Sequence, residues 1–160
     1  MKTYYILLGG NLGDRTENFN AAKQQIANEV GAIVAESALY ETAAWGAKNQ
    51  PDFLNQALAV TSELAPETFL KQCLAIEDAL GRVRVERWGA RTMDIDVLLI
   101  DEDVYETPQL QVPHPRLHLR KFALLPLCDI APDVLHPIYN KKINEILAIC
   151  DDKTAVNLVI

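Results

Sequence analysis

Two aspartates separated by one residue, Asp94 and Asp96, are the side chains in this sequence whose spacing points most directly to chemistry. They open an apolar run that continues to Ile100 and predicts a strand. Because alternate side chains of a strand share one face, both carboxylates point the same way, with Cα atoms roughly 7 Å apart. Such a pair is costly to bury without a cation, and Mg2+ commonly binds one or two carboxylates together with phosphate and water oxygens. Alone the pattern is weak evidence, since aspartates paired with arginine or exposed at a strand end look the same.

Four arginines, Arg82, Arg84, Arg87 and Arg91, stand directly before the acidic pair. Six of the seven arginines fall between positions 82 and 120, although the net charge of the chain is -7. Any one of them could belong to a solvated loop paired with local acids, but the cluster favours binding of a compact anion. Guanidinium groups beside a divalent metal are what phosphoryl transfer needs, because charge spreads over the non-bridging oxygens. Flanking glycines indicate a loop that closes over a polyphosphate.

The remaining sequence supplies the elements that must position these residues. Apolar patterns predict strands at 3–8, 33–40, 53–62, 93–100 and 155–159, helices at 14–30, 66–80 and 143–149, a loop at 41–52 and an unassigned apolar stretch at 122–127. The opening order of strand, helix, strand, strand, helix, strand predicts an α+β fold. We expect a ferredoxin-like sandwich, with helices packed on one face of a mainly antiparallel sheet, as a single domain over 1–160.

Composition narrows the class of protein. Hydrophobic residues make up 49% and charged residues 23%, which is typical of a globular domain, and no apolar run approaches the roughly 18 residues of a membrane helix. The negative net charge argues against nucleic-acid and membrane partners. Cys73, Cys128 and Cys150 are widely spaced among apolar neighbours, so we expect buried free thiols in a reducing compartment. The first residues enter a strand without a leader pattern, and we therefore expect a cytoplasmic location.

The segment from Gly81 to Asp96 resembles the signature of the 6-hydroxymethyl-7,8-dihydropterin pyrophosphokinase family, Gly-Arg-x-Arg-x-x-Arg-Trp-Gly-Pro-Arg-x-x-Asp-x-Asp. Further matches are Gly-x-Asn-Leu-Gly-Asp at 9–14, Tyr-Glu-Thr at 40–42, Gln-Pro-Asp-Phe-Leu-Asn at 50–55, Ile-Glu at 76–77 and Val-Pro-His-Pro-Arg-Leu-His at 112–118. Two departures stand out. Ala90 replaces the usual proline of the arginine segment, and Ala43-Ala44-Trp45 replaces a loop that typically contains proline.

The resemblance implies a reaction of folate biosynthesis in which the hydroxymethyl oxygen of the pterin attacks the β-phosphorus of ATP and AMP leaves. It also implies roles for matched residues: Arg82, Arg91, Asp94 and Asp96 in catalysis, with two Mg2+ ions on the aspartates; Arg84, Arg87, His114, Arg120 and Glu77 towards ATP; Thr42, Phe53, Asn55, Trp88 and Phe122 towards the pterin. A flat heteroaromatic ring suits two aromatic faces and an amide at its edge. Ordinary core packing is the alternative for both phenylalanines, and a salt bridge is the alternative for Glu77.

Two other functions fit part of the pattern. One is a different Mg2+-dependent transferase that uses a nucleotide and an Asp-x-Asp site, such as a nucleotidyltransferase or a glycosyltransferase. The other is a ligand-binding domain without catalysis, which would need neither metal nor paired aspartates. A phosphate-binding loop of the Walker type is excluded at 9–14, because Gly-Lys-Ser/Thr is missing there and a structural turn is expected instead. We expect ATP and the pterin alcohol as partners, no nucleic acid, no membrane and a monomer.

Overall fold

The computed structural model describes residues 1–43, 51–81 and 92–159. Within these ranges, one antiparallel sheet contains β1 (Lys2–Gly10), β2 (Ala32–Glu36), β3 (Tyr40–Thr42), β4 (Phe53–Ser62), β5 (Asp94–Ile100) and β10 (Val156–Leu158). The strand order is β10-β3-β4-β1-β5, and β2 pairs with β4 on the side where β3 also pairs. Two small hairpins lie apart from it, β6 (Tyr105–Glu106) with β7 (Gln111–Val112) and β8 (Leu135–His136) with β9 (Lys141–Lys142).

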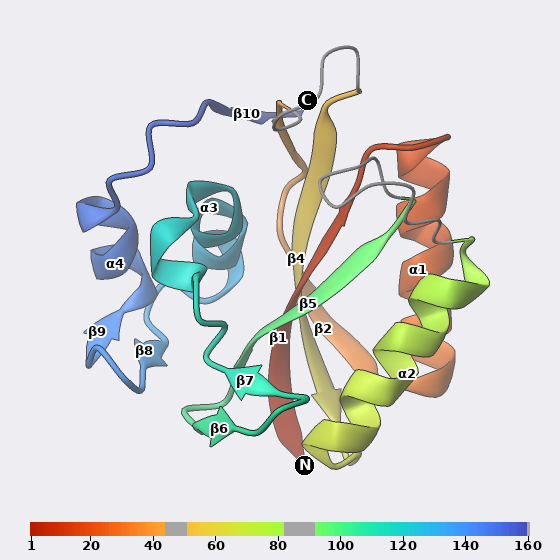
Figure 1. Ribbon diagram of the computed structural model, residues 1–160, viewed down its shortest axis with the longest axis horizontal. Helices are drawn as coiled ribbons and strands as arrows, with labels where there is room; N and C mark the ends of the chain where they lie inside the picture. Colours follow the sequence, from red (N-terminus) through yellow and green to blue (C-terminus); the bar gives the residue numbers. More distant parts are fainter. Residues whose placement is uncertain (44–50, 82–91, 160) are drawn as a thin grey trace.

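Helices cover both faces of the sheet (Figure 1). On one face lie α1 (Arg15–Glu29) and α2 (Pro66–Ala79), and on the other lie η1 (Leu117–Leu119), α3 (Lys121–Ile130) and α4 (Ile143–Ile149). The α+β class is confirmed, but the expectation of helices on one face only was wrong. Strand β1 explains why, because Tyr4, Ile6 and Leu8 join the core under α1 and α2 while Leu7 joins the core under α3 and α4. Central strands with two apolar faces need a layer on each side.

The predicted helices 14–30 and 66–80 are confirmed, and their first residues explain where they begin. The Asp14 carboxylate accepts a hydrogen bond of 3.0 Å from the N–H of Glu17 and so caps α1. Pro66 opens α2, a position where its missing N–H costs nothing. The buried side chains of α1 include Phe19, Ala22 and Ile26, which have the three- and four-residue spacing seen in the sequence.

The predicted strand 33–40 is divided into β2 and β3. Between them the hydroxyl of Ser37 accepts a hydrogen bond of 2.9 Å from the N–H of Ala57, in place of a backbone carbonyl. The side chain therefore interrupts the ladder along β4. Strand β3 pairs with β4 as far as Thr42, which lies opposite Phe53 and therefore not in the loop expected at 41–52. The unassigned apolar stretch 122–127 lies within α3.

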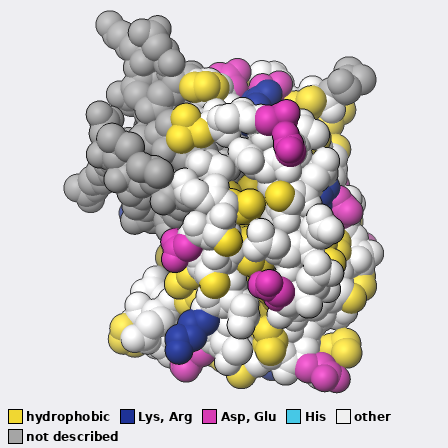
Figure 2. Space-filling view, turned by 90° about the vertical axis from the view of Figure 1, so that its right-hand side faces the viewer, with side chains coloured by type: hydrophobic (Ala, Val, Ile, Leu, Met, Phe, Trp, Pro, Cys, Tyr) yellow, Lys and Arg dark blue, Asp and Glu magenta, His cyan; other side chains and the backbone are white. Residues whose placement is uncertain are grey.

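The face of α1 and α2 carries acidic, basic and apolar side chains scattered over it (Figure 2). No helix in the described ranges is both long enough and apolar enough to cross a membrane.

All three cysteines are free, but only Cys73 is buried, whereas Cys128 and Cys150 are half-buried. The expectation of three buried thiols therefore holds for one of them.

Candidate active site

A cavity of about 940 Å³ lies between the sheet and the layer of α3 and α4. Its lining comprises Leu7, Gly9, Thr42, Ala43, Phe53, Asn55, Asp94, Asp96, Arg116, His118, Leu119, Arg120, Phe122, Tyr139, Lys141, Ile146, Ile149, Cys150, Asp151, Asp152 and Thr154. Strands β1, β3, β4 and β5 supply its floor, and the start of α3, the helix α4 and the C-terminal segment supply its walls. Seven residues predicted for the site meet here: Thr42, Phe53, Asn55, Asp94, Asp96, Arg120 and Phe122.

Asp94 and Asp96 point to this cavity from the start of β5. Both are half-buried, while Ile95 and Val97 join the core on the other face. The shared face predicted for the two aspartates is confirmed. Carboxylate oxygens are the donors that Mg2+ prefers, so this pair fits the metal chemically. No group of three or more His, Cys, Asp or Glu side chains that could hold a metal occurs in the described part of the chain.

Gly9 lies on the strand between the two parts of the cavity floor, the part that carries Asn55 and the part that carries Asp94. In the sheet register it is opposite Asn55 on β4 and opposite Asp94 on β5, which separates those residues by two strand spacings, roughly 10 Å. A Cβ at this position would lie 3.4 Å from Oδ1 of Asn55. The missing side chain therefore keeps the floor open. The sequence predicted a structural turn at 9–14, but β1 extends through Gly10.

Asn55 has the partner that a buried amide requires. Its Nδ2 donates a hydrogen bond of 3.2 Å to Oγ1 of Thr42, and both residues are buried. Thr42 lies opposite Phe53 in the pairing of β3 with β4, so these three predicted pterin contacts form one cluster. Phe53 and Phe122 are half-buried and line the cavity, which distinguishes them from ordinary core residues.

Arg120 precedes α3 and brings a cation to the same cavity. Its guanidinium carbon lies 5.5 Å from the centre of the Phe122 ring, within the range of a cation–π contact. Burial lowers the pKa of Arg120, and the nearby Asp96 carboxylate acts in the opposite direction. The guanidinium stays charged at neutral pH all the same.

His114 lies beside the cavity and is not part of its lining. Its ring Nδ1 accepts a hydrogen bond of 3.1 Å from the backbone N–H of Arg116, and the backbone N–H of His114 donates to the carbonyl of Leu98. Burial lowers the pKa of His114 to about 4, with smaller contributions from Arg120 and Arg116. The imidazole is therefore neutral at physiological pH. The contact with ATP phosphate stays a prediction.

Glu77 has a buried position in the α2 layer, outside the lining of the cavity. Its carboxylate accepts a hydrogen bond of 2.6 Å from the N–H of Ile95. The side chain thus supports the backbone between the two aspartates. Its expected contact with ATP stays a prediction, as do the roles of Arg82, Arg84, Arg87, Trp88 and Arg91, which lie outside the described residues.

Several residues of the lining carried no prediction. Arg116 and His118 stand in the matched segment 112–118, which was a signal that they lie near the site. Nε2 of His118 and the hydroxyl of Tyr139 are 3.2 Å apart, joining η1 to the turn between β8 and β9. Asp151, Asp152 and Thr154 belong to no motif, and only the path of the chain brings them to the cavity.

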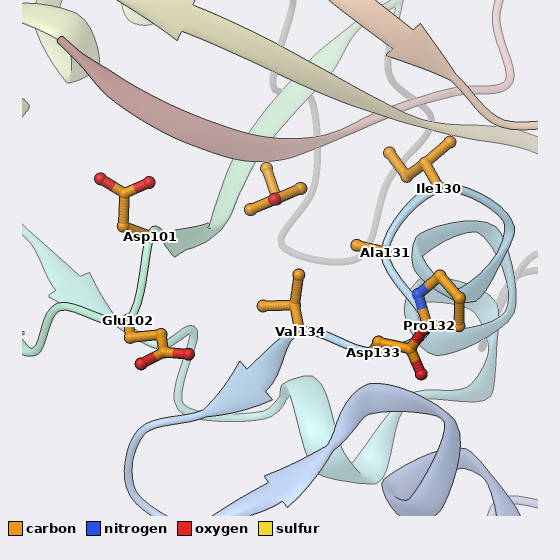
Figure 3. A pocket seen from close by; sticks show the side chains of 8 residues that line it. Asp101, Glu102, Ile130, Ala131, Pro132, Asp133 and Val134 are labelled. Atoms are coloured by element: carbon orange, nitrogen blue, oxygen red, sulfur yellow. The ribbon is translucent and has the colours of Figure 1, made fainter.

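A second, smaller cavity of about 510 Å³ contains none of the predicted residues. Its lining is Tyr5, Asp101, Glu102, Ile130, Ala131, Pro132, Asp133 and Val134. Asp101 and Glu102 lie on one side and residues 130–134 on the other (Figure 3). The three carboxylates have no basic or aromatic neighbours in the lining besides Tyr5, so the larger cavity is the candidate active site.

The paired carboxylates of Asp94 and Asp96, the guanidinium of Arg120 and the buried amide of Asn55 open into one cavity beside aromatic rings. That set is typical of an enzyme that transfers a phosphorus-containing group to a flat substrate. Residues 5–132 match the family model for 7,8-dihydro-6-hydroxymethylpterin-pyrophosphokinase (HPPK). The chain belongs to this family, whose members transfer pyrophosphate from ATP to hydroxymethyldihydropterin in folate biosynthesis.

Curated relatives cover almost the whole chain. It is 41% identical over 145 residues to the 2-amino-4-hydroxy-6-hydroxymethyldihydropteridine pyrophosphokinase of Aquifex aeolicus. The matched region covers 91% of this chain and 90% of that enzyme. The chain is 42% identical over 152 residues to the enzyme of the same name from Methylorubrum extorquens, covering 94% and 95%. The protein is therefore a pyrophosphokinase with ATP as co-substrate, which decides against the other transferases and the non-catalytic domain considered above.

Solved structures agree on the fold. The wild-type Plasmodium falciparum HPPK-DHPS structure with pteroate is similar, with a TM-score of 0.72 and 16% identity. The match covers 92% of this chain and 42% of that chain, so this protein spans less than half the length of that one. At this identity the likeness shows the fold alone.

Proposed function

We propose that Asp94 and Asp96 hold Mg2+ in this pyrophosphokinase, two ions when ATP is bound, and that the pterin ring lies between Phe53 and Phe122. The observation that carries the proposal is the position of Asp94 and Asp96 in the same cavity as Asn55. Only the strand of Gly9 lies between Asp94 and Asn55, so a pterin held by the amide would lie within reach of a phosphate group held at the aspartates.

Magnesium suits the donors that these residues offer. Asp94 and Asp96 supply anionic oxygens on one strand face, and the triphosphate of ATP supplies others. When bound, Mg2+ neutralises charge on the phosphate oxygens and orients the transferred group. The aspartates would fix the site of the metal relative to the sheet, and hence relative to the pterin.

The pterin side of the cavity would orient the acceptor. The hydrogen bond from Asn55 to Thr42 restricts the rotation of the amide, so that its remaining polar sites present a fixed pattern to the edge of the ring. Phe53 and Phe122 come from different layers, β4 and α3, which suits contact with both faces of a flat ring. Holding the hydroxymethyl group in line with the phosphorus would supply much of the rate enhancement.

Charge on the transferred diphosphate would be balanced by arginines. Arg120 reaches the cavity directly, and half-burial strengthens its effect on a phosphate. Roles for Arg82 and Arg91 in stabilising the transferring charge, and for Arg84, Arg87 and Trp88 in binding and closure, rest on the matched signature. His114 is a neutral imidazole and would contact phosphate as a hydrogen-bond donor through Nε2.

We also propose that residues 1–160 work as a single-domain monomer in the cytoplasm. Free cysteines suit a reducing compartment. The net charge of -7 favours small-molecule partners over nucleic acid and anionic membranes. Size-exclusion chromatography with light scattering would check the monomer, which a stable dimer mass would contradict.

Product analysis with and without metal tests the reaction and the metal together. The purified protein is given ATP and 6-hydroxymethyl-7,8-dihydropterin with Mg2+ or with EDTA. We expect AMP and the pterin diphosphate with Mg2+ and background turnover with EDTA. Full turnover in EDTA would refute the metal, and release of ADP in place of AMP would refute diphosphate transfer.

A further inference from the structure

The C-terminal segment, residues 150–158, joins two walls of the active-site cavity. It leaves α4 and reaches the edge of the sheet at β10 (Figure 1). Cys150, Asp151, Asp152 and Thr154 line the cavity along the way. At its end Val156 lies opposite Thr42 in the pairing of β10 with β3. The segment is thus fixed to the strand that carries the hydrogen-bond partner of Asn55.

Asp152 also fixes this segment to the start of α3. Its Oδ2 accepts a hydrogen bond of 3.0 Å from the N–H of Lys121, and its Oδ1 accepts one of 2.9 Å from the N–H of Thr154. Lys121 is the first residue of α3, where the N–H has no acceptor within the helix. The residue before it, Arg120, provides no side-chain cap. Asp152 therefore caps α3 from a distant part of the chain, and its negative charge suits a helix N-terminus.

The capped residue stands between two proposed substrate contacts, Arg120 and Phe122. A shift of the Lys121 backbone would move both neighbours, because they share its peptide bonds. We propose that Asp152 is a positioning residue that sets Phe122 and Arg120 for the pterin and for ATP. This inference rests on the proposed roles of those two residues.

The carboxylate is suited to a permanent cap. Burial tends to raise the pKa of Asp152, but hydrogen bonds from Thr154 and Lys121 outweigh it and leave the pKa below its usual range. Asp152 is therefore charged throughout the neutral range, as a cap of a helix N-terminus should be.

Three variants separate positioning from general stability. Asp152→Ala removes the cap, Asp152→Asn keeps an acceptor oxygen without the charge, and Asp133→Ala removes one carboxylate that is largely exposed and outside the active-site lining. Each is titrated with 6-hydroxymethyl-7,8-dihydropterin in the presence of Mg2+ and a non-hydrolysable ATP analogue, and its melting temperature is recorded. We expect the alanine variant to weaken pterin binding about fivefold, the effect of losing one capping hydrogen bond, with about half of the loss recovered in the asparagine variant. Asp133→Ala should bind as the parent does.

A double-variant cycle with Phe122→Ala supplies the deciding test. If Asp152 acts through Phe122, its removal has little further effect on pterin binding once the ring is gone. The inference would be overturned if the two substitutions lowered pterin affinity by independent factors that multiply in the double variant. It would also be overturned if Asp152→Ala lowered the melting temperature but left the pterin affinity unchanged. Unchanged pterin binding in Phe122→Ala would instead refute the proposed role of Phe122. Should Asp152→Ala fail to fold, the same cycle is completed with Asp152→Asn, which retains one acceptor oxygen in place of the two that serve the N–H groups of Lys121 and Thr154.

Discussion

The carboxylate of Glu77 and the backbone N–H of Ile95 form a hydrogen bond of 2.6 Å that links α2 to β5. Ile95 is the residue between Asp94 and Asp96, and β5 ends the strand order of the sheet. A helix on one face of the sheet thus fixes the backbone that presents both carboxylates to the cavity on the other. For the metal site proposed above, a residue that holds the backbone of the ligands in place is expected to matter nearly as much as the ligands themselves.

Replacing Glu77 by alanine should impair the use of metal. The N–H of Ile95 would lose a buried acceptor and the β5 backbone would shift, so we expect kcat/KM to fall about 10- to 100-fold and the Mg2+ concentration for half-maximal rate to rise. Glu77→Gln retains an acceptor and should recover part of the loss. A Mg2+ titration of initial rates checks this. An unchanged Mg2+ requirement in a folded Glu77→Ala enzyme would contradict the positioning role.

Asp96→Asn should abolish most of the turnover. The amide keeps the size of the side chain but removes the anionic oxygen, so we expect kcat to fall about 10³-fold. The melting temperature should stay within a few degrees of that of the parent. Rapid-quench measurement of AMP release gives the rate, and circular dichroism confirms the fold. Asp133→Asn controls for the loss of one charge on the surface. An active, folded Asp96→Asn enzyme would show that this carboxylate is no metal ligand.

Gly9 should limit the size of the pterin side of the cavity. A Cβ there lies 3.4 Å from Oδ1 of Asn55, which is near ordinary contact, so we expect Gly9→Ala to raise the KM for pterin only a few-fold. The branched side chain of Gly9→Val would reach into the cavity and should raise that KM more than tenfold while leaving the KM for ATP almost unchanged. Steady-state kinetics with each substrate varied in turn measures both. Equal effects on the two constants would place Gly9 outside the pterin region.

The sequence predicted local features well and long-range relationships poorly. Spacing of three and four located α1 and α2, and alternation placed Asp94 and Asp96 on one face, because both periods follow from the backbone itself. The place of Gly9 between Asn55 and Asp94 depends on register between three strands, which no local pattern encodes. The α3 helix was missed for a related reason. A short apolar run that contains Pro126 looks the same in a buried strand as in a helix.

Gly31 should be intolerant of any side chain. A Cβ at this position would overlap the carbonyl oxygen of Thr61 and lie 3.0 Å from the Cβ of Ser62, where β4 leaves no flexible group to move aside. We expect Gly31→Ala to lower the free energy of unfolding by about 2 kcal/mol. Gly81→Ala is a useful comparison, because its surroundings are open and only its φ of 77° opposes a side chain. Urea unfolding of both variants measures the difference, and a Gly31→Ala protein as stable as the parent would contradict the overlap.

His136 should make the protein less stable in mild acid. Its Nδ1 accepts hydrogen bonds from the N–H groups of Ile138 and Tyr139, which fix the turn between β8 and β9. Burial, with a smaller effect of His118, lowers the pKa of His136 to about 4. The unfolded side chain has a pKa of about 6.5, so between these values the unfolded chain binds a proton that the folded chain does not. Stability is therefore lost as the pH falls from about 6.5 to about 4, by about 1 to 3 kcal/mol for this residue.

Urea unfolding at several pH values in that window tests the prediction. Asn in place of His136 keeps an acceptor for the turn but cannot titrate there, so His136→Asn should show a shallower loss of stability towards acid. Part of the slope should persist, because the pKa of His114 is also lowered to about 4, through burial and then through Arg120 and Arg116. The double variant His114→Asn, His136→Asn should be flatter again. If the parent and His136→Asn lose stability in parallel between pH 6.5 and 4, the protonation of His136 is not coupled to folding, and the turn tolerates a charged imidazole.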